Sequence, residues 1–326
     1  MRKLKRSTVV ITGATSGVGR ACALQFADKG AALMLAARRA DALDEIVREC
    51  RDRGAQAHGV ALDVRDESAM LELARETVSR HGRIDVWVNA ASANAYGRIE
   101  ELPSEWWRAV IDTNLTGYFL GLQAAIPWMR DQGRGTIINI GSILDTTVVP
   151  YQAAYIASKH GVRALTDSAR QETSDVKGIR LCLISPGAID TPFIANAANV
   201  TGRRIEPPVR VLDARAVAAK VVSCTRRPRD DIFVGPDNVS VMLSERVAPG
   251  LTRRLMTVLG NHDQFGDEPQ ARTSGSLLEP QPDVPARIDG GWRGHGTKNH
   301  RRKRGALLGL GALAAGGFWL ARAPRA

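Results

Sequence analysis

Residues 7–89 alternate between strand-like and helix-like segments, and this order leaves few folds open to the chain. Thr8–Thr12 and Ala32–Ala37 are short runs of apolar and β-branched residues, whereas residues 20–29 and 40–53 have helical compositions. When strands alternate with helices of about 10–15 residues, the strands pair in parallel and the helices cover both faces of the sheet. The pattern therefore predicts an α/β domain built on a parallel sheet.

The first predicted strand runs into a turn that contains three glycines. Such a turn lets a phosphate approach the backbone, where free N–H groups and the N-terminus of the next helix bind it. We therefore expect the turn to bind a cofactor through Gly13, Ser16, Gly17, Val18 and Gly19. A mobile loop without a ligand is the alternative, and the position between a strand and a helix favours phosphate binding.

The end of the second predicted strand indicates which dinucleotide binds. An acidic residue there would bind the ribose 2′-hydroxyl of NAD, but this chain has Ala37, Arg38 and Arg39. Two guanidinium groups suit the 2′-phosphate of NADP, which arginine binds with two hydrogen bonds. Asp63 and Val64 follow the third strand, where the carboxylate could accept from the adenine amino group. The alternative is a pair of solvated arginines at the start of a helix.

Ser142, Tyr155 and Lys159 form the candidate catalytic group. Tyr155 and Lys159 are four residues apart in a segment of helical composition, so they share one face of a helix. A lysine ammonium favours the phenolate, and we expect it to lower the pKa of Tyr155 from about 10 toward neutrality. Ser142 follows an apolar run, where its hydroxyl could polarise a carbonyl that the phenol protonates. A surface helix with a tyrosine and a solvated lysine is the alternative for this pair alone.

A turn after a later strand should lie beside the nicotinamide. Pro186, Gly187 and Thr191 follow the apolar strand at residues 179–184, at the same predicted edge of the sheet. Residues 193–212 that come next mix apolar and charged groups without periodicity. We expect them to form an irregular lid over the substrate.

The net charge of +11 belongs to one end of the chain. Residues 293–326 contain eight arginines or lysines and no acid, so the rest carries 11 − 8 = +3. The basic run lacks interleaved aromatic groups, so we expect no nucleic-acid binding. The apolar run at residues 8–11 is too short for an export signal, so we expect none. The cysteines are scattered and lack metal-ligand spacing, so we expect reduced thiols, no metal site and a cytoplasmic protein. They are Cys22, Cys50, Cys182 and Cys224.

Taken together, these residues resemble the short-chain dehydrogenase/reductase family over roughly residues 5–250. The positions that match are Thr12, Gly13, Gly17, Gly19, Asp63, Asn89, Asn114, Ser142, Tyr155, Lys159, Pro186, Gly187 and Thr191. The resemblance implies a single domain with a Rossmann-type, doubly wound parallel sheet of about seven strands. It also implies that the chain forms homo-oligomers.

The resemblance assigns roles to four residues. Tyr155 would be the general acid or base, Lys159 would also bind the nicotinamide ribose, Ser142 would orient the substrate, and Asn114 would hold a water in a proton relay. The implied reaction is NADPH-dependent reduction of a ketone, or oxidation of the secondary alcohol, on an apolar substrate. An NAD-preferring alcohol dehydrogenase and a catalytically silent dinucleotide-binding scaffold remain as alternatives. The chain departs from the family after Asn89, where Ala-Ala-Ser replaces Asn-Ala-Gly.

The C-terminal extension is not explained by this resemblance. We expect the domain to span residues 1–260, with a polar, Pro- and Gly-rich linker or irregular extension at 261–304. Residues 305–321 carry no charge and are long enough to reach the lower limit for a membrane span. More basic residues precede this segment than follow it, which places the enzyme on the cytoplasmic face, with contact through 301–325. A buried or dimer-forming apolar tail, or a helix lying on a surface, is the alternative.

Overall fold

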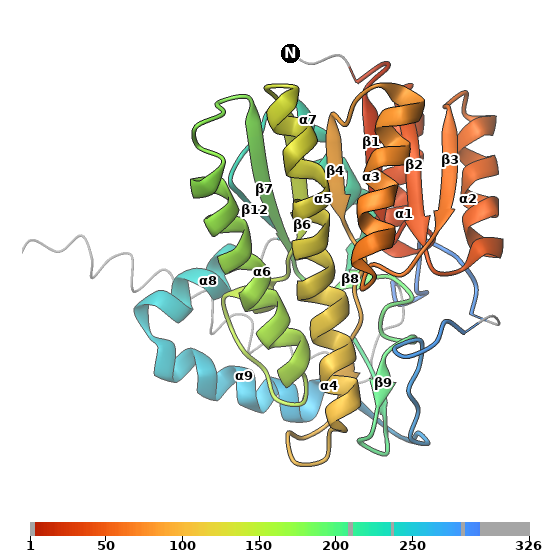
Figure 1. Cartoon of the computed structure of the whole chain (residues 1–326). Helices are drawn as coiled ribbons and strands as arrows, with labels where there is room; N and C mark the ends of the chain where they lie inside the picture. Colours follow the sequence, from red (N-terminus) through yellow and green to blue (C-terminus); the bar gives the residue numbers. More distant parts are fainter. Residues whose placement is uncertain (1–3, 208–210, 236–237, 282–283, 294–326) are drawn as a thin grey trace, which may run out of the picture.

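The computed structural model describes residues 4–207, 211–235, 238–281 and 284–293, and a parallel sheet forms the centre of this part (Figure 1). The strands lie in the order β12-β7-β6-β4-β1-β2-β3. They are β1 (Thr8–Thr12), β2 (Ala32–Ala37), β3 (Ala57–Ala61), β4 (Val86–Asn89), β6 (Gly135–Ile140), β7 (Ile179–Pro186) and β12 (Asp231–Val234). The strand order reverses between β1 and β4, so the predicted Rossmann-type sheet of seven strands is confirmed.

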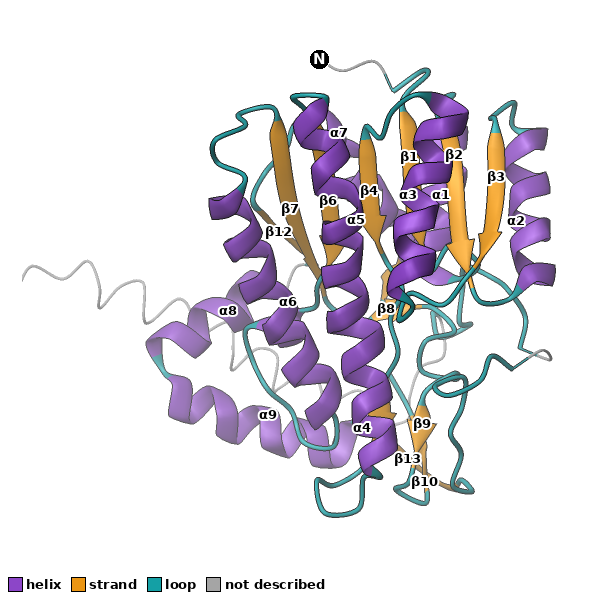
Figure 2. Cartoon of the chain, in the orientation of Figure 1, coloured by secondary structure: helices purple, strands orange, loops and turns teal. Residues whose placement is uncertain are grey.

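Helices cover both faces of the sheet, as Figure 2 shows. One face packs against α1 (Gly17–Ala27), α2 (Ala40–Asp52) and α7 (Ala214–Arg226). The other packs against α3 (Glu67–His81), α5 (Gly117–Asp131) and α6 (Ala153–Glu172). Because both faces are covered, β1, β4 and β6 are buried along their whole length, which explains their continuous apolar composition.

The parallel register brings the ends of the strands to one edge. Thr12 of β1 aligns with Ala36 of β2 and with Asn89 of β4, and Asn89 in turn aligns with Asn139 of β6. The turns that leave these strands therefore meet at the carboxyl edge, where open α/β sheets bind their ligands.

Short strand pairs cover this carboxyl edge. They are β5 (Ala95–Tyr96) with β9 (Ala198–Asn199), β8 (Ile189–Asp190) with β11 (Leu212–Asp213), and β10 (Arg203–Ile205) with β13 (Phe265–Pro269). The prediction that residues 193–212 are irregular is therefore wrong in part. These strands are only two to five residues long and pair with distant partners, so they leave no periodic pattern in the sequence.

Two helices near the C-terminal end of the domain begin at residues that suit a helix N-terminus. Asp213 caps α7, because its carboxylate accepts a hydrogen bond of 2.8 Å from the backbone N–H of Arg215. Residues 238–263 contain two further helices, α8 (Asn238–Val247) and α9 (Pro249–Asp263). Pro249 starts the second helix at a position where its missing N–H costs nothing.

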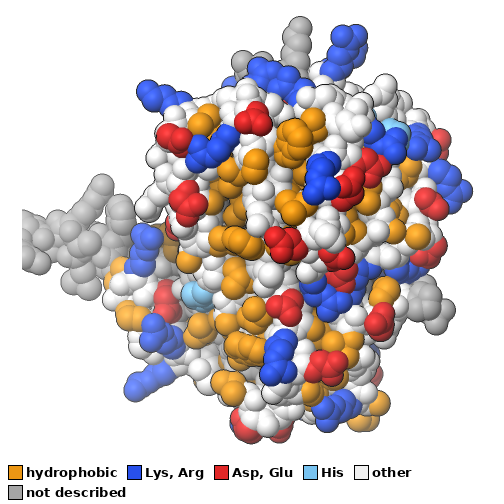
Figure 3. Space-filling view, viewed as in Figure 1, with side chains coloured by type: hydrophobic (Ala, Val, Ile, Leu, Met, Phe, Trp, Pro, Cys, Tyr) orange, Lys and Arg blue, Asp and Glu red, His pale blue; other side chains and the backbone are white. Residues whose placement is uncertain are grey.

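Part of the C-terminal extension packs on the domain. Within the described residues, β13 pairs with β10, and the chain then follows the carboxyl edge as far as residue 293. No helix in this described part is long and apolar enough to cross a membrane, and the apolar segment 305–321 lies outside it. The face in Figure 3 carries acidic and basic side chains interspersed with scattered hydrophobic ones. All four cysteines are buried, and none forms a disulfide bond.

Candidate active site

A cavity of about 550 Å³ opens at the carboxyl edge of the sheet. It brings together residues that the sequence predicts from six separate segments. Those that line it are Gly13, Ser16, Gly17, Val18, Gly19, Arg38, Arg39, Asp63, Val64, Ser142, Tyr155, Lys159, Pro186, Gly187 and Thr191. Thr12, Asn89 and Asn114 were also predicted and do not line it.

Two glycines where β1 leads into α1 leave no room for a Cβ atom. Gly13 has a φ of +69°, and a Cβ there would come within 2.7 Å of the backbone of Ala91. A Cβ on Gly19 would lie 2.1 Å from the carbonyl oxygen of Gly13. Ser16 is the N-cap of α1, and its side chain makes no capping hydrogen bond to the helix. The turn and helix N-terminus therefore have the shape and polarity to hold a phosphate.

The nucleotide end of the cavity, defined by Gly17, Arg38 and Arg39, presents cationic and N–H donors. Burial lowers the pKa of the Arg38 guanidinium, and nearby Asp63 acts in the opposite direction. Burial also acts to raise the pKa of the Asp63 carboxyl, but hydrogen bonds from Arg65 outweigh it and lower the pKa. Arg65 donates to both Asp63 oxygens, so an adenine amino group would share an acceptor that is already paired.

The catalytic end, defined by Ser142, Tyr155 and Lys159, lies at the carboxyl ends of β6 and β7. Lys159 is 1% exposed, and its Nζ donates to the carbonyl oxygen of Ile140 at 2.9 Å. This Nζ lies 5.5 Å from the centre of the Tyr155 ring. Ser142 Oγ accepts from the backbone N–H of Leu144 at 3.1 Å, which fixes the hydroxyl at the start of a short helical turn.

The direction predicted for the Tyr155 pKa is wrong. Burial raises the pKa of the phenol to about 12, although a hydrogen bond with Ser142 acts to lower it. Burial also lowers the pKa of Lys159 to about 7, against the effect of Asp145. The sequence shows that Tyr155 and Lys159 share a helix face, but it does not show that both are desolvated. Desolvation disfavours both charged forms, and it is the largest effect on the pKa of each group.

Asn114 occupies an irregular turn rather than a regular helix. It lies in a π-helical segment, η1 (Asp112–Thr116), which joins α4 (Ser104–Ile111) to α5. Its side-chain oxygen accepts from the backbone of Ala93 and from Ser92, and its amide donates to Ala93 and to Ser158. These four bonds fill the capacity of the side chain, so a water held by Asn114 would have to bind its backbone.

Thr12 and Asn89 support the site from beneath. Asn89 is fully buried, donates to Asn139 and accepts from the indole of Trp87, each at 2.8 Å. Thr12 Oγ1 accepts from the backbone N–H of Ala90 at 3.3 Å. Their side chains therefore connect β1, β4 and β6 below the loop at residues 90–92 and do not reach the cavity.

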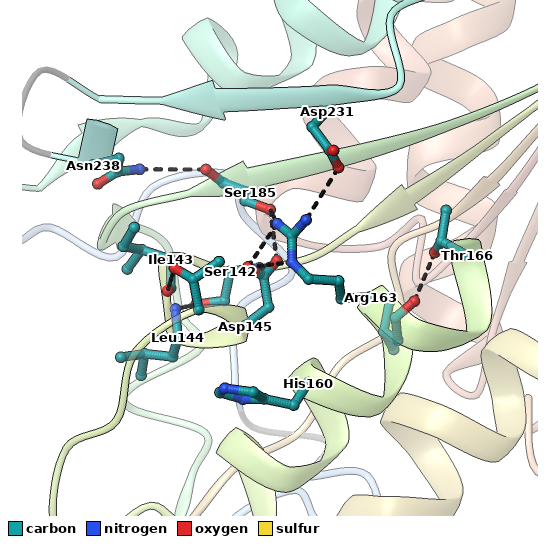
Figure 4. A network of polar contacts seen from close by, with 12 residues as sticks. Ser142, Ile143, Leu144, Asp145, His160, Arg163, Thr166, Ser185, Asp231 and Asn238 are labelled. Carbon is teal, nitrogen blue, oxygen red and sulfur yellow. Dashed lines mark hydrogen bonds and ion pairs between the residues drawn. The ribbon is translucent and has the colours of Figure 1, made fainter. Parts of the chain in front are cut away.

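A buried carboxylate that the sequence analysis missed supports Ser142 (Figure 4). The side chain of Asp145 has no exposed surface, and it accepts from Arg163 at 2.8 Å and from Ser185 at 2.6 Å. It also accepts from the backbone N–H of Ser142 and completes a capping box with this serine. A serine followed three residues later by an acid is a recognisable signal of this arrangement.

Further cavity residues left no signal in the sequence. Asn94 donates to Gln152 at 2.7 Å, and Gln152 donates to Gln264 at 2.5 Å, so a polar chain crosses one wall. Gln152 and Gln264 are 112 residues apart, and only the fold brings them together. A later part of the chain also contributes to the lining, although its composition predicts only an irregular extension. The residues are Ser276, Pro280, Gln281, Val284, Pro285 and Ala286.

Comparisons with known proteins agree with this geometry. A family model described as short chain dehydrogenase matches residues 7–200. The uncharacterized oxidoreductase YxnA of Bacillus subtilis is 31% identical over 287 residues, which cover 85% of this chain and 79% of YxnA. Dehydrogenase/reductase SDR family member 7B of Bos taurus is 33% identical over 264 residues, covering 78% and 81% of the two chains.

Solved structures show the same fold. A short-chain dehydrogenase/reductase from Burkholderia phymatum in complex with NAD has a TM-score of 0.69 and 26% identity, covering 78% of this chain and 97% of that one. A metagenomic short-chain oxidoreductase in complex with NADP has a TM-score of 0.61 and 29% identity, covering 72% and 98%. Similar proteins thus bind either nicotinamide dinucleotide.

Proposed function

The chain belongs to the short-chain dehydrogenase family, and we propose that it uses NADPH to reduce a ketone, or NADP to oxidise the corresponding secondary alcohol. One observation carries this proposal. Ser142, Tyr155 and Lys159 line the same cavity as the glycine turn and the two arginines of the nucleotide end. A proton donor and a dinucleotide site within one cavity are what a carbonyl reduction requires.

The residues present fit a dinucleotide. The crowded glycine turn leaves space for a phosphate where a Cβ would otherwise stand, and α1 begins there. Arg38 and Arg39 would bind the 2′-phosphate, and Asp63 would accept from adenine. Pro186, Gly187 and Thr191 would contact the nicotinamide end, together with Lys159 at the ribose. When bound, the reduced dinucleotide supplies the hydride that reduces the carbonyl carbon.

Tyr155 is suited to protonate the substrate oxygen. With its pKa raised to about 12, the phenol keeps its proton at neutral pH, which fits the reduction direction. Ser142 Oγ accepts from Leu144, so its O–H group remains able to donate to the same substrate oxygen. Once the proton has left, the ammonium of Lys159 stabilises the phenolate. The proton relay through Asn114 remains part of this proposal.

The cavity wall supports an apolar substrate. Beyond the catalytic end, the lining contains few charges and several large apolar side chains. The apolar residues are Leu144, Val149, Phe193, Ile194 and Met256. The Phe193 ring lies 5.5 Å from the Tyr155 ring, so an apolar group attached to the carbonyl would contact it.

Replacing Tyr155 by phenylalanine tests the mechanism. We expect Tyr155→Phe to lower turnover at least ~10³-fold in a screen of ketones followed by NADPH absorbance, because it removes the hydroxyl proposed to deliver the proton. NADPH affinity should change less than about twofold, since the phenol is not part of the nucleotide end.

Tyr151→Phe is the matched control, because Tyr151 packs edge-on against Phe265 and does not line the cavity. Turnover that survives in Tyr155→Phe would refute the mechanism. A wild-type chain that binds NADPH but turns over no substrate would favour the silent binding protein.

The assembly and location of the chain are further parts of the proposal. We expect a homo-oligomer, since α4 and α5 leave Trp107 and Phe119 40% and 47% exposed. Light scattering of the purified chain tests this. For residues 305–321 we keep the membrane-anchor hypothesis, based on their composition and flanking charges. Co-flotation of the full chain with lipid vesicles, lost when these residues are deleted, would support it.

A further inference from the structure

The last described part of the chain crosses the nucleotide end of the cavity. Residues 274–281 and 284–293 are here named the C-terminal strap. Ser276, Gln281 and Ala286 of the strap line the cavity. In Figure 1 the blue C-terminal stretch passes below the carboxyl ends of β2 and β3. The strap therefore lies where the adenosine half of a dinucleotide would bind.

Backbone carbonyls of the strap contact all three groups that define the nucleotide end. The N–H of Gly17 donates to the carbonyl of Arg287 at 3.0 Å. Arg38 Nη2 donates to the carbonyl of Ser276 at 2.6 Å. Arg39 also donates to strap carbonyls, those of Gln281 and Val284. The donors proposed for phosphate thus already have acceptors from the protein itself.

Both ends of the strap are anchored to the domain by further contacts. At one end, Ser276 donates its N–H to the carbonyl of Asn196 at 2.9 Å, and Leu277 is 1% exposed in an apolar cluster. At the other end, buried Asp190 accepts from the backbone of Gly290 at 3.0 Å and of Trp292 at 2.8 Å.

Ion pairs reinforce the second anchor. Arg293 binds Asp190, and Asp289 binds both Arg293 and Arg215. Burial acts to raise the pKa of Asp190, but hydrogen bonds from the strap backbone and from Arg293 outweigh it and lower the pKa. The middle of the strap is therefore held over the nucleotide end by contacts that do not depend on a cofactor.

A carbonyl and a phosphate oxygen compete for the same donors. A hydrogen bond from a guanidinium to a charged phosphate is stronger than one to a neutral carbonyl, so phosphate should displace the strap. Each displaced carbonyl nevertheless loses a hydrogen bond, and this loss makes the free energy of cofactor binding less favourable. A cofactor that can bind only after the strap has moved shows an affinity reduced by the fraction of molecules in the open state.

We propose that the C-terminal strap is an internal competitor for the cofactor, which lowers NADPH affinity by holding Gly17, Arg38 and Arg39 with its carbonyls. This inference rests on the proposed function, because it takes the cavity to bind a dinucleotide. Two of the three contacted groups are the arginines expected at the 2′-phosphate. The strap therefore acts more strongly on NADPH than on NADH and sets the preference between them.

Loosening the second anchor tests the proposal in the full-length chain. The double variant Asp289→Ala/Arg293→Ala removes ion pairs that do not line the cavity. We expect it to bind NADPH about tenfold more tightly and NADH about threefold more tightly, measured by calorimetry. Arg204→Ala is the matched control, because it breaks another exposed arginine pair, with Glu268 at 2.5 Å, outside the strap. It should leave both affinities unchanged.

Hydrogen exchange of the wild-type chain gives a second measurement that needs no variant. Adding NADPH should speed exchange in strap peptides while it protects the β1–α1 turn. Slower exchange in the strap, or weaker NADPH binding by the double variant, would show that the strap clamps the cofactor, and would overturn the proposal. Equal affinities of variant and wild type would also overturn it while leaving the proposed function intact. If neither protein bound any dinucleotide, the proposed function and this inference would fail together.

Discussion

The two ends of the cavity are held in different ways. At the catalytic end, Lys159 donates to Ile140, only 19 residues away, and both lie within the region matched by the family model. At the nucleotide end, Arg38 donates to Ser276, which is 238 residues away and outside that region. The catalytic geometry is therefore built by the common fold, whereas access to the nucleotide end depends on an added segment.

Because the two ends are held by different segments, we expect one to control the catalytic step and the other to control which dinucleotide binds. A substitution at the catalytic end should change turnover and leave dinucleotide affinity nearly constant. A substitution at the nucleotide end should change affinity and discriminate NADPH from NADH. A variant that changes both to the same extent would show that the two ends are not independent.

The largest effect should come from removing the buried ammonium. We expect Lys159→Met to lower kcat/KM about 10³-fold, because the Tyr155 phenolate loses the charge that stabilises it. NADPH affinity should fall much less, since Lys159 would contact only the ribose of the nicotinamide half. Steady-state kinetics and calorimetry check this prediction. The exposed lysine of α7 gives the control Lys220→Met, and a Lys159→Met enzyme within tenfold of wild type would contradict the prediction.

Removing one guanidinium should reverse cofactor choice at the other end. Arg38→Ala deletes charge-assisted hydrogen bonds to the 2′-phosphate, so NADPH affinity should fall roughly 10–100-fold. NADH affinity should stay constant or rise, because Arg38 also holds the strap through Ser276. Binding of both dinucleotides to the same preparation provides the measurement. Equal losses for NADPH and NADH would remove the 2′-phosphate role of Arg38.

A smaller effect is expected from the carboxylate beneath Ser142. Asp145 raises the pKa of Lys159 by its charge, so Asp145→Asn should lower that pKa further. The loss of activity that accompanies deprotonation of Lys159 should then begin at lower pH. We expect kcat/KM to fall about tenfold at neutral pH, with the basic limb of its pH profile shifted downward. Asp231→Asn is the control, because Asp231 pairs with the other side of Arg163. A loss of kcat/KM without a shifted limb would indicate a purely structural role for Asp145.

The sequence predicts what depends on neighbouring residues. The alternation of elements predicts the sheet. Glycines between a strand and a helix predict a phosphate-binding turn at Gly13 and Gly19, and the spacing of Tyr155 and Lys159 predicts that they share one helix face. All of these are readable within one or two consecutive elements. The cavity then confirms that residues from distant segments meet at one edge of the sheet.

What the sequence does not predict depends on burial and on distant contacts. The pKa of Tyr155 moves upward because the fold desolvates the phenol, which spacing alone cannot show. Asn89 matches the family position, but its side chain is used by Trp87 and Asn139. The strap has a composition typical of linkers, and backbone carbonyls, which every residue carries, make its contacts with Arg38. Sequence patterns carry no record of such contacts.

The smallest effect concerns stability at the catalytic end and follows from burial of Lys159. Folding lowers the pKa of this lysine from 10.5 to about 7, so between these pH values the unfolded chain binds more protons than the folded one. The free energy of unfolding should therefore rise with pH across this window. Below pH 7 the lysine is protonated in both the folded and the unfolded chain, so it no longer makes the free energy of unfolding depend on pH. Relative to Lys159→Met, the wild type should gain about 1–2 kcal/mol between pH 7 and pH 9 in urea denaturation. Because the Tyr155 phenol titrates above this range in both states, it does not disturb the comparison. Parallel pH dependences for the two proteins would mean that Lys159 stays fully protonated, and the catalytic end would then hold a permanent buried charge.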